Sequence, residues 1–195
     1  MTTTYLPLAS AVLPRKRAVT IALVVGFALL TAAAAQFKIN LPSTPVPITG
    51  QTFAVLLAGG VLGSRAGAAS QALYWMLGLL FPFYADGGSG WKVASGATGG
   101  YLVGFIVAAW AVGFLAERGQ DRSVASAMPA FLAGTVIIYA FGVPWLAAEL
   151  DVSWQRAMEL GAVPFIIGDL AKVALAGLLL PGAWQITGKR RLARH

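Results

Sequence analysis

Two residues of opposite charge, Asp169 and Lys172, lie three positions apart inside an apolar stretch near the C-terminus. In a helix this spacing places both side chains on one face. A charge inside a membrane costs about 2.5–3.5 kcal/mol on insertion scales, so intramembrane charges indicate function by default. We therefore expect the pair to form a ligand site in the outer half of the membrane. The alternative is a structural ion pair that holds helices together.

A second group of candidates lies in the glycine-rich segment 82–99, which contains Asp86. Its end, Gly99 and Gly100, leads directly into the next apolar stretch at Tyr101. Free N–H groups and the positive dipole end of a helix N-terminus suit a carboxylate or a carbonyl oxygen. The GK[ST] ending of a phosphate loop is missing. The segment is thus a candidate binding loop, with a flexible connector as the alternative.

A third candidate is the segment 36–51, with prolines at positions 42, 45 and 47. Prolines favour an extended, semi-rigid path. We expect this segment to be a lid, with Gln51 and Thr52 at its hinge to the following helix. A simple spacer is the alternative.

Composition indicates which class of protein carries these residues. The chain has 195 residues, 58% of them hydrophobic and 11% charged, and its mean hydropathy is +0.75. Soluble domains carry about 25% charged residues, so the composition argues for a membrane protein. There is no cysteine, and the only histidine is His195. Thiol catalysis, a histidine-based triad and a Cys- or multi-His metal site are therefore excluded, and we expect no catalytic residues, no metal and no cofactor.

Six apolar stretches are separated by polar or glycine-rich breaks, and no alternating β-barrel pattern is present. A spanning helix needs about 20 residues, so the second and third stretches are short. We expect an all-α integral membrane protein with six transmembrane helices in a single domain, 1–195. A cleaved signal peptide is the alternative for the first stretch, but its apolar run is long for one. The stretches cover residues 18–35, 52–62, 66–81, 100–116, 125–148 and 164–186.

The charge pattern predicts the orientation. With six crossings and both termini cytoplasmic, segment 1–17 and tail 187–195 lie inside, and cytoplasmic positions hold most of the cations. The net charge of +7 then reflects orientation and not nucleic-acid binding. The ten inside cations are Arg15, Lys16, Arg17, Arg65, Arg118, Arg122, Lys189, Arg190, Arg191 and Arg194; the three outside are Lys38, Lys92 and Arg156; Lys172 is within a helix.

Small residues recur at one-turn spacing, as at Gly59, Gly63 and Gly67, and at Ala28 and Ala32. Such residues permit close helix contact in membranes. We interpret the glycines as packing positions within the bundle. The two alanines either pack within the bundle or face another protein.

Three ordered motifs resemble the BioY family, the biotin-specific S components of energy-coupling factor (ECF) vitamin transporters. They are PVPITGQTFAVLLAG at 45–59, TGGYLVGF at 98–105 and GDLAK at 168–172. The resemblance implies a six-helix protein of a bacterial-type cytoplasmic (inner) membrane that captures biotin from outside. It also implies a membrane T component and two cytoplasmic ATPases as partners, with Ala28 and Ala32 at the T-component contact. Ala18 and Ala22 have the same spacing.

The residues are compatible with biotin as ligand. Asp169 would accept from the ureido N–H groups, Lys172 would donate to the ureido carbonyl or pair with Asp169, and Tyr101 would cover the apolar rings. The tail carboxylate would lie near the N–H groups at Gly99 and Gly100 or near Lys38. The chain has no nucleotide-binding motif, so ATP hydrolysis would fall to partners. An S component for another vitamin, a membrane-embedded enzyme and a purely structural membrane protein are the alternatives.

Overall fold

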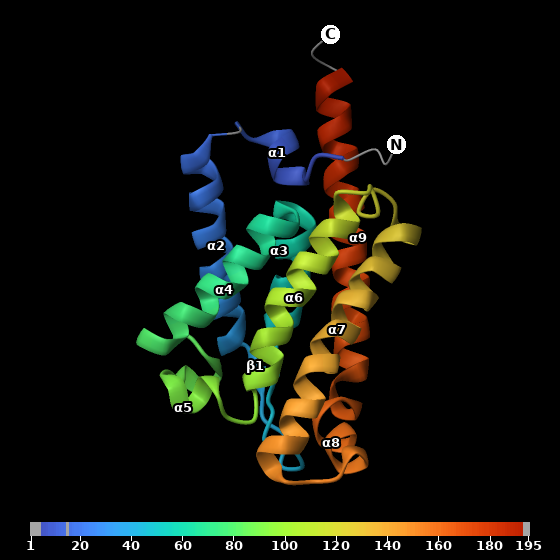
Figure 1. Ribbon diagram of the computed structural model, residues 1–195. Coiled ribbons are helices and arrows are strands. Elements are labelled where there is room, and N and C mark those ends of the chain that lie inside the picture. The colour runs from blue at the N-terminus through green and yellow to red at the C-terminus, as the bar shows by residue number, and fades with distance from the viewer. Residues whose placement is uncertain (1–4, 15, 193–195) are drawn as a thin grey trace.

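The computed structural model describes residues 5–14 and 16–192, with the backbone alone for 188–192. Expectations that rest on Arg15, Arg194 and His195 lie outside the described residues. The chain is almost entirely helical (Figure 1), and its elements run in this order. They are α1 (Leu8–Val12), α2 (Arg17–Gln36), β1 (Lys38–Ile39), β2 (Ile48–Thr49), α3 (Gln51–Leu62), α4 (Ser64–Leu80), η1 (Ala85–Gly87), α5 (Trp91–Ala94), α6 (Gly99–Ala116), α7 (Val124–Leu150), α8 (Trp154–Gly161), η2 (Val163–Phe165) and α9 (Ile166–Leu192).

Each of the six apolar stretches corresponds to one long helix of the described chain: α2, α3, α4, α6, α7 and α9. Four stretches are long and apolar enough to cross a membrane: Arg17–Gln36, Gly99–Ala116, Val124–Leu150 and Trp154–Thr187. The all-helical prediction is therefore confirmed. Helix α3 has 12 residues and α4 has 17, short of the roughly 20 that a span needs, so six crossings stay a prediction.

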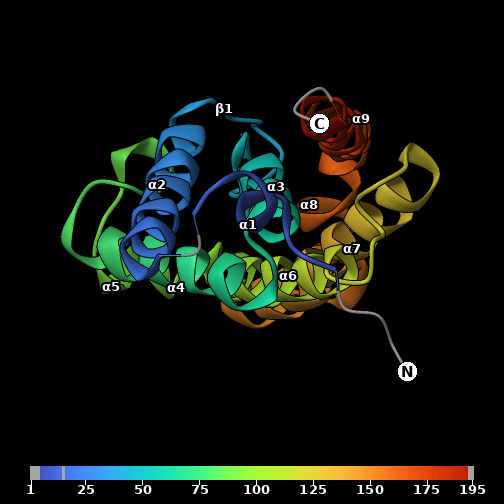
Figure 2. The same cartoon turned by 90° about the horizontal axis from the view of Figure 1, so that it is seen from above.

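The long helices form two layers. Viewed along the bundle, α2, α3 and α9 lie in one row and α4, α6 and α7 in the other (Figure 2), with α2 on α4, α3 on α6 and α9 on α7. Glycines allow close contact in this bundle. A Cβ on Gly59 would lie 2.5 Å from the Ala109 carbonyl oxygen, and one on Gly67 would lie 2.9 Å from the Cα of Gly59. Packing is thus confirmed for these two, whereas Gly63 forms the α3–α4 turn with φ +83°.

The connections gather at two ends of the bundle (Figure 1). We call the end that carries the β1–β2 hairpin, η1, α5 and α8 the loop end, and the end that carries α1 and the 117–123 turn the basic end. The hairpin segment at the loop end is held by contacts within itself and with α8. The β strands pair antiparallel, with Lys38 opposite Thr49, and the hydroxyl of Thr44 donates to the Leu160 carbonyl oxygen over 2.7 Å, which ties the hairpin to α8.

At the basic end, the 117–123 turn is held by polar contacts of its acidic side chains. Glu117 accepts from the backbone N–H and the hydroxyl of Ser64, at 2.8 and 3.0 Å, and so caps the N-terminus of α4. Asp121 is buried and accepts from the indole N–H of Trp184 over 2.5 Å. Burial raises the pKa of Asp121, because the charged form is poorly solvated. These contacts tie the turn to α4 and α9.

The expectation that Ala28 and Ala32 face a partner is wrong for the described chain. Ala28 is fully buried and Ala32 is 6% exposed, and both belong to the main hydrophobic core. Their face of α2 packs against the bundle because small side chains let α4 approach closely. In contrast, Ala18, Ala22 and Gly26 lie on the exposed face of α2, and no other described helix or loop has an atom within 4 Å of where a Cβ of Gly26 would be.

Candidate functional site

A cavity of about 450 Å³ opens among the helices toward the loop end. The hairpin segment, the 84–98 segment and helices α3, α4, α6, α7 and α9 all contribute to its wall. Apolar and aromatic groups dominate, as is usual for small-molecule sites. The lining residues are Pro45, Val46, Pro47, Thr49, Gln51, Thr52, Tyr74, Tyr84, Ala85, Asp86, Gly88, Lys92, Val93, Gly96, Ala97, Thr98, Tyr101, Leu102, Phe105, Ile138, Tyr139, Phe165, Asp169 and Lys172.

Asp169 and Lys172 lie in this wall as an ion pair, with Nζ 2.8 Å from Oδ1. The Thr52 hydroxyl of α3 donates to Asp169 Oδ1 over 3.1 Å and accepts from Lys172 Nζ over 2.9 Å. The Tyr139 hydroxyl of α7 donates to Asp169 Oδ2. The carboxylate is therefore fixed by three helices, and these contacts occupy three of its roughly four acceptor positions. One position stays open to a ligand donor.

Gln51 begins α3 beside this cluster and is 6% exposed. Its amide donates to the Tyr74 hydroxyl over 2.7 Å and accepts from the Thr49 hydroxyl over 2.9 Å. The side chain is thus locked between the hairpin and α4. Gln51 and Thr52 line the cavity together, and the hairpin segment contributes Pro45, Val46 and Pro47. That this segment is a lid with Gln51 and Thr52 at its hinge stays a prediction.

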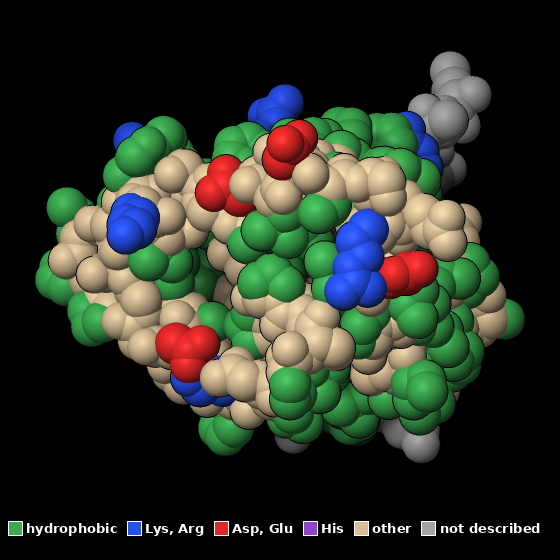
Figure 3. All heavy atoms as spheres, turned by 90° about the horizontal axis from the view of Figure 1, so that it is seen from below, with side chains coloured by type: hydrophobic (Ala, Val, Ile, Leu, Met, Phe, Trp, Pro, Cys, Tyr) green, Lys and Arg blue, Asp and Glu red, His purple; other side chains and the backbone are tan. Residues whose placement is uncertain are grey.

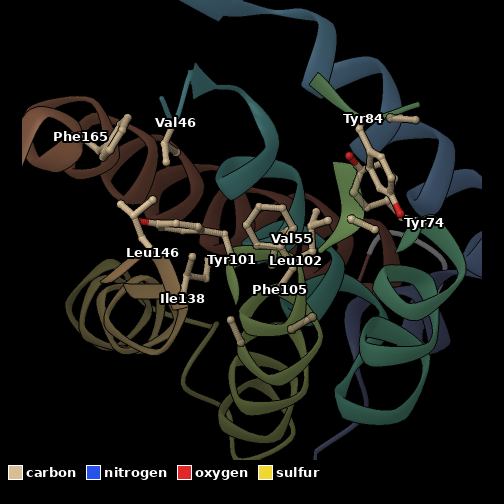
Figure 4. Packing of buried hydrophobic residues seen from close by; sticks show 14 of the residues in the cluster. Val46, Val55, Tyr74, Tyr84, Tyr101, Leu102, Phe105, Ile138, Leu146 and Phe165 are labelled. Atoms are coloured by element: carbon tan, nitrogen blue, oxygen red, sulfur yellow. The ribbon is translucent and has the colours of Figure 1, made fainter. Parts of the chain in front are cut away.

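Tyr101 forms part of the aromatic wall. Its ring lies near Val46, Ile138 and Phe165 (Figure 4). Its hydroxyl donates to the Gly161 carbonyl oxygen over 2.7 Å, so the ring is held in place from α8. On the other side of the hydrophobic core in Figure 4, the rings of Tyr74 and Tyr84 meet edge to face with centroids 5.8 Å apart. These rings present flat apolar surfaces.

Gly99 and Gly100 do not line the cavity. A Cβ on Gly100 would lie 2.3 Å from the Trp145 Cβ, and the N–H of Gly99 already donates to the Gly96 carbonyl oxygen over 2.8 Å. Both glycines are buried against α7. Their position serves helix packing, and the expectation that they offer free N–H groups to a ligand is not supported. The preceding residues Ala97 and Thr98 line the cavity instead.

Asp86 lines the cavity at the loop end, where it forms an ion pair with Lys38. The Asn40 amide also donates to Asp86 Oδ1 over 3.4 Å. Asp86 adopts a left-handed backbone conformation with φ 61°, which aspartate tolerates better than most residues. The pair connects the hairpin to η1. Figure 3 looks onto this end and shows its few charged side chains scattered among hydrophobic ones.

Sequence reasoning missed Tyr74, Tyr139 and Lys92 as cavity residues. A signal existed for Tyr139, because a hydroxyl in the middle of an apolar stretch needs a partner. The same signal marked Tyr74, which lies in the middle of the apolar stretch 66–81. Within residues 5–14 and 16–192, no group of three or more His, Cys, Asp or Glu side chains comes together to hold a metal ion.

The fold and this cavity define a class: a multi-pass integral membrane protein with a solute-sized site at one end of its helical bundle. The sequence pattern of the BioY family matches residues 5–189. The chain therefore belongs to the BioY family.

Curated relatives and one solved structure agree with this assignment. The chain is 34% identical over 160 residues to the biotin transporter BioY of Rhizobium etli, covering 78% of this chain and 85% of the relative. It is 41% identical over 143 residues to the biotin transporter BioY of Thermotoga maritima, covering 72% of this chain and 82% of the relative. The S component for biotin from an ECF-type ABC transporter has the same fold, with a TM-score of 0.79, 22% identity and coverage of 89% and 95%.

Proposed function

We propose that this protein is the substrate-capture (S) component of a biotin uptake transporter. The observation that carries the proposal is the Asp169–Lys172 pair, whose carboxylate is buried and which lines a cavity of about 450 Å³. A purely structural pair would have no need of such a cavity. Family membership and relatives that are named biotin transporters give the ligand its identity. Biotin would be bound as cargo and not as a cofactor.

The site chemistry supports a defined pose for the ureido ring. One of the ring's N–H groups donates to the open position on Asp169, and the ring carbonyl accepts from Lys172, which also holds the carboxylate in place. The Tyr139 hydroxyl fixes the second carboxylate oxygen. A site with buried acceptors discriminates strongly against analogues that lack the matching donors, so the ureido group is the main determinant of specificity.

Purified protein tests the function directly. Detergent-solubilised protein incubated with radiolabelled biotin and passed over a desalting column should retain the label, and excess unlabelled biotin should displace it. Thiamine and riboflavin should not compete. Binding of one of those vitamins, with no retention of biotin, would identify an S component for another vitamin.

The orientation is part of the proposal: six crossings of a bacterial-type inner membrane, with the loop end and its cavity facing outward. The positions of the cations in the described part of the chain support this orientation. Arg17, Arg65 and Arg118 adjoin helix ends at the basic end, whereas Lys38 and Lys92 lie at the loop end. Cations prefer the cytoplasmic side of a membrane.

Cysteine labelling should confirm this orientation. The native chain has no cysteine, so each variant carries a single thiol. Ser89→Cys, in the loop-end segment, should react with an impermeant maleimide on intact cells. Ser123→Cys, at the start of α7, should react only after the cells are opened. The reverse pattern would contradict the proposed orientation.

We further propose that the protein depends on partners for energy, a membrane T component and two cytoplasmic ATPases. The exposed stripe of Ala18, Ala22 and Gly26 on α2 is the proposed docking surface, since small residues permit close helix contact. It lies toward the basic end, away from the cavity. The same spacing at Ala28 and Ala32 is used inside the bundle.

Ala22→Leu should abolish co-purification with the T component and leave biotin binding unchanged, because the added bulk projects from an exposed helix face. Ala33→Leu, on the exposed surface of α2 but about two turns beyond Gly26 toward the loop end, is the matched control and should retain the partner. Equal loss in both variants, or loss in neither, would remove the stripe from the docking surface.

A further inference from the structure

The charged groups around the cavity are matched in pairs, with one exception. Asp169 pairs with Lys172, and Asp86 pairs with Lys38. Lys92 is the remaining charged residue among those that line the cavity in the described part of the chain. In the part of the chain that the structure describes, its ammonium group has neither a hydrogen-bond nor an ion-pair partner. The lined cavity therefore carries one uncompensated positive charge.

Lys92 is held at the cavity by a fixed element. It belongs to α5, a single helical turn whose neighbours are anchored to the bundle: the N–H of Gly90 donates to the Gly78 carbonyl oxygen over 3.0 Å, and the Trp91 ring meets the Trp75 ring edge to face at 6.2 Å. Ala94 of the same turn is buried. The Lys92 side chain is exposed at the surface as well as lining the cavity. It therefore lies at the cavity mouth.

The other cations of the loop end, and the Gly99 N–H group that the sequence suggested, are already engaged. Lys38 is neutralised by Asp86, whose charge would repel a carboxylate. The N–H of Gly99 is bonded to the Gly96 carbonyl oxygen. Arg156, the remaining cation of the loop-end segments, pairs with Glu159 on α8 and does not line the cavity.

We propose that Lys92 binds the carboxylate of the ligand and makes the site selective for a monoanion. The inference rests on the proposed function, because it takes biotin with its ureido ring at Asp169 and its valerate tail directed toward the mouth. The tail then crosses the apolar middle of the cavity, past Leu102 and Ile138. The ligand's single negative charge compensates the single unmatched cation.

The test compares biotin with biotin methyl ester, which keeps both rings and lacks the charge. Because Lys92 is solvent-exposed, its pairing with the carboxylate is screened. Lys92→Gln should weaken biotin binding by about two- to tenfold and leave ester binding unchanged, and Lys92→Arg should restore most of the biotin affinity. Affinities are measured by isothermal titration of the purified full-length protein at low ionic strength.

Arg156→Gln is the matched control, since it removes a loop-end cation that does not line the cavity, and it should leave the affinities for both ligands unchanged. Equal weakening of biotin and ester by Lys92→Gln would overturn the proposal, as would no effect on either ligand or an equal effect of Arg156→Gln. If the unmodified protein bound neither biotin nor its ester, the proposed function itself would fail.

Discussion

Replacing Asp169 by asparagine is expected to weaken biotin binding by about tenfold to a hundredfold, the effect of losing a hydrogen bond to a charged group worth about 1.5–3 kcal/mol. The amide replaces one carboxylate oxygen by an N–H donor. Whichever way it turns, that donor faces either the ligand's ureido N–H or one of the groups that fix the side chain, Tyr139 or Thr52. The charge that holds Lys172 is also lost.

The measurement is a biotin titration of purified Asp169→Asn protein, accompanied by its thermal melting curve and gel-filtration profile. Asp151→Asn is the matched control. Asp151 is exposed and caps the C-terminus of α7 in a left-handed backbone conformation, which asparagine also adopts readily. The control should bind biotin normally. Unchanged affinity in a well-folded Asp169→Asn protein would remove Asp169 from the binding site.

Adding one methyl group at Gly100 is expected to destabilise the bundle. The new Cβ would lie 2.3 Å from the Trp145 Cβ and 2.4 Å from the Phe141 carbonyl oxygen, distances at which the helices α6 and α7 must move apart. Overpacking of this kind costs about 1–3 kcal/mol. Gly100→Ala should therefore lower the melting temperature in detergent, and any loss of biotin binding should follow from the loss of folded protein.

Gly168→Ala provides the control for this substitution. Gly168 lies in α9, next to Asp169, and apart from its chain neighbours and the backbone of its own helix no atom of the described chain stands within 4 Å of the place that a Cβ would take there. Alanine at this position should keep or slightly raise the melting temperature, because alanine favours a helix over glycine by about 1 kcal/mol. A Gly100→Ala protein with an unchanged melting temperature and reduced biotin affinity would instead assign Gly100 to the binding site.

The sequence by itself determined the class and the most important polar pair. An apolar composition with six apolar runs, four of them long enough to span a bilayer, favours membrane helices, since backbone groups in lipid must bond within their own segment. The charges of Asp169 and Lys172 stood out because their burial is costly in any arrangement. Both properties are local: they depend on residue type and on spacing along one helix. The motifs at 45–59, 98–105 and 168–172 indicated the family because a motif, too, consists of residue types at fixed spacing along the chain.

Tertiary structure decided which side of each helix faces the bundle interior or the cavity and which faces outward. Ala28 and Ala22 are both small residues on the same helix, yet one is buried and the other is exposed, and no spacing rule distinguishes them when nearly every position on the helix is apolar. Likewise, Gly100 packs against Trp145, and Tyr139 reaches Asp169 across 30 positions of sequence. Lys92 stands out only after Lys38 and Lys172 are seen in ion pairs. Contacts between distant residues depend on how the helices pack, and that packing is a property of the whole bundle.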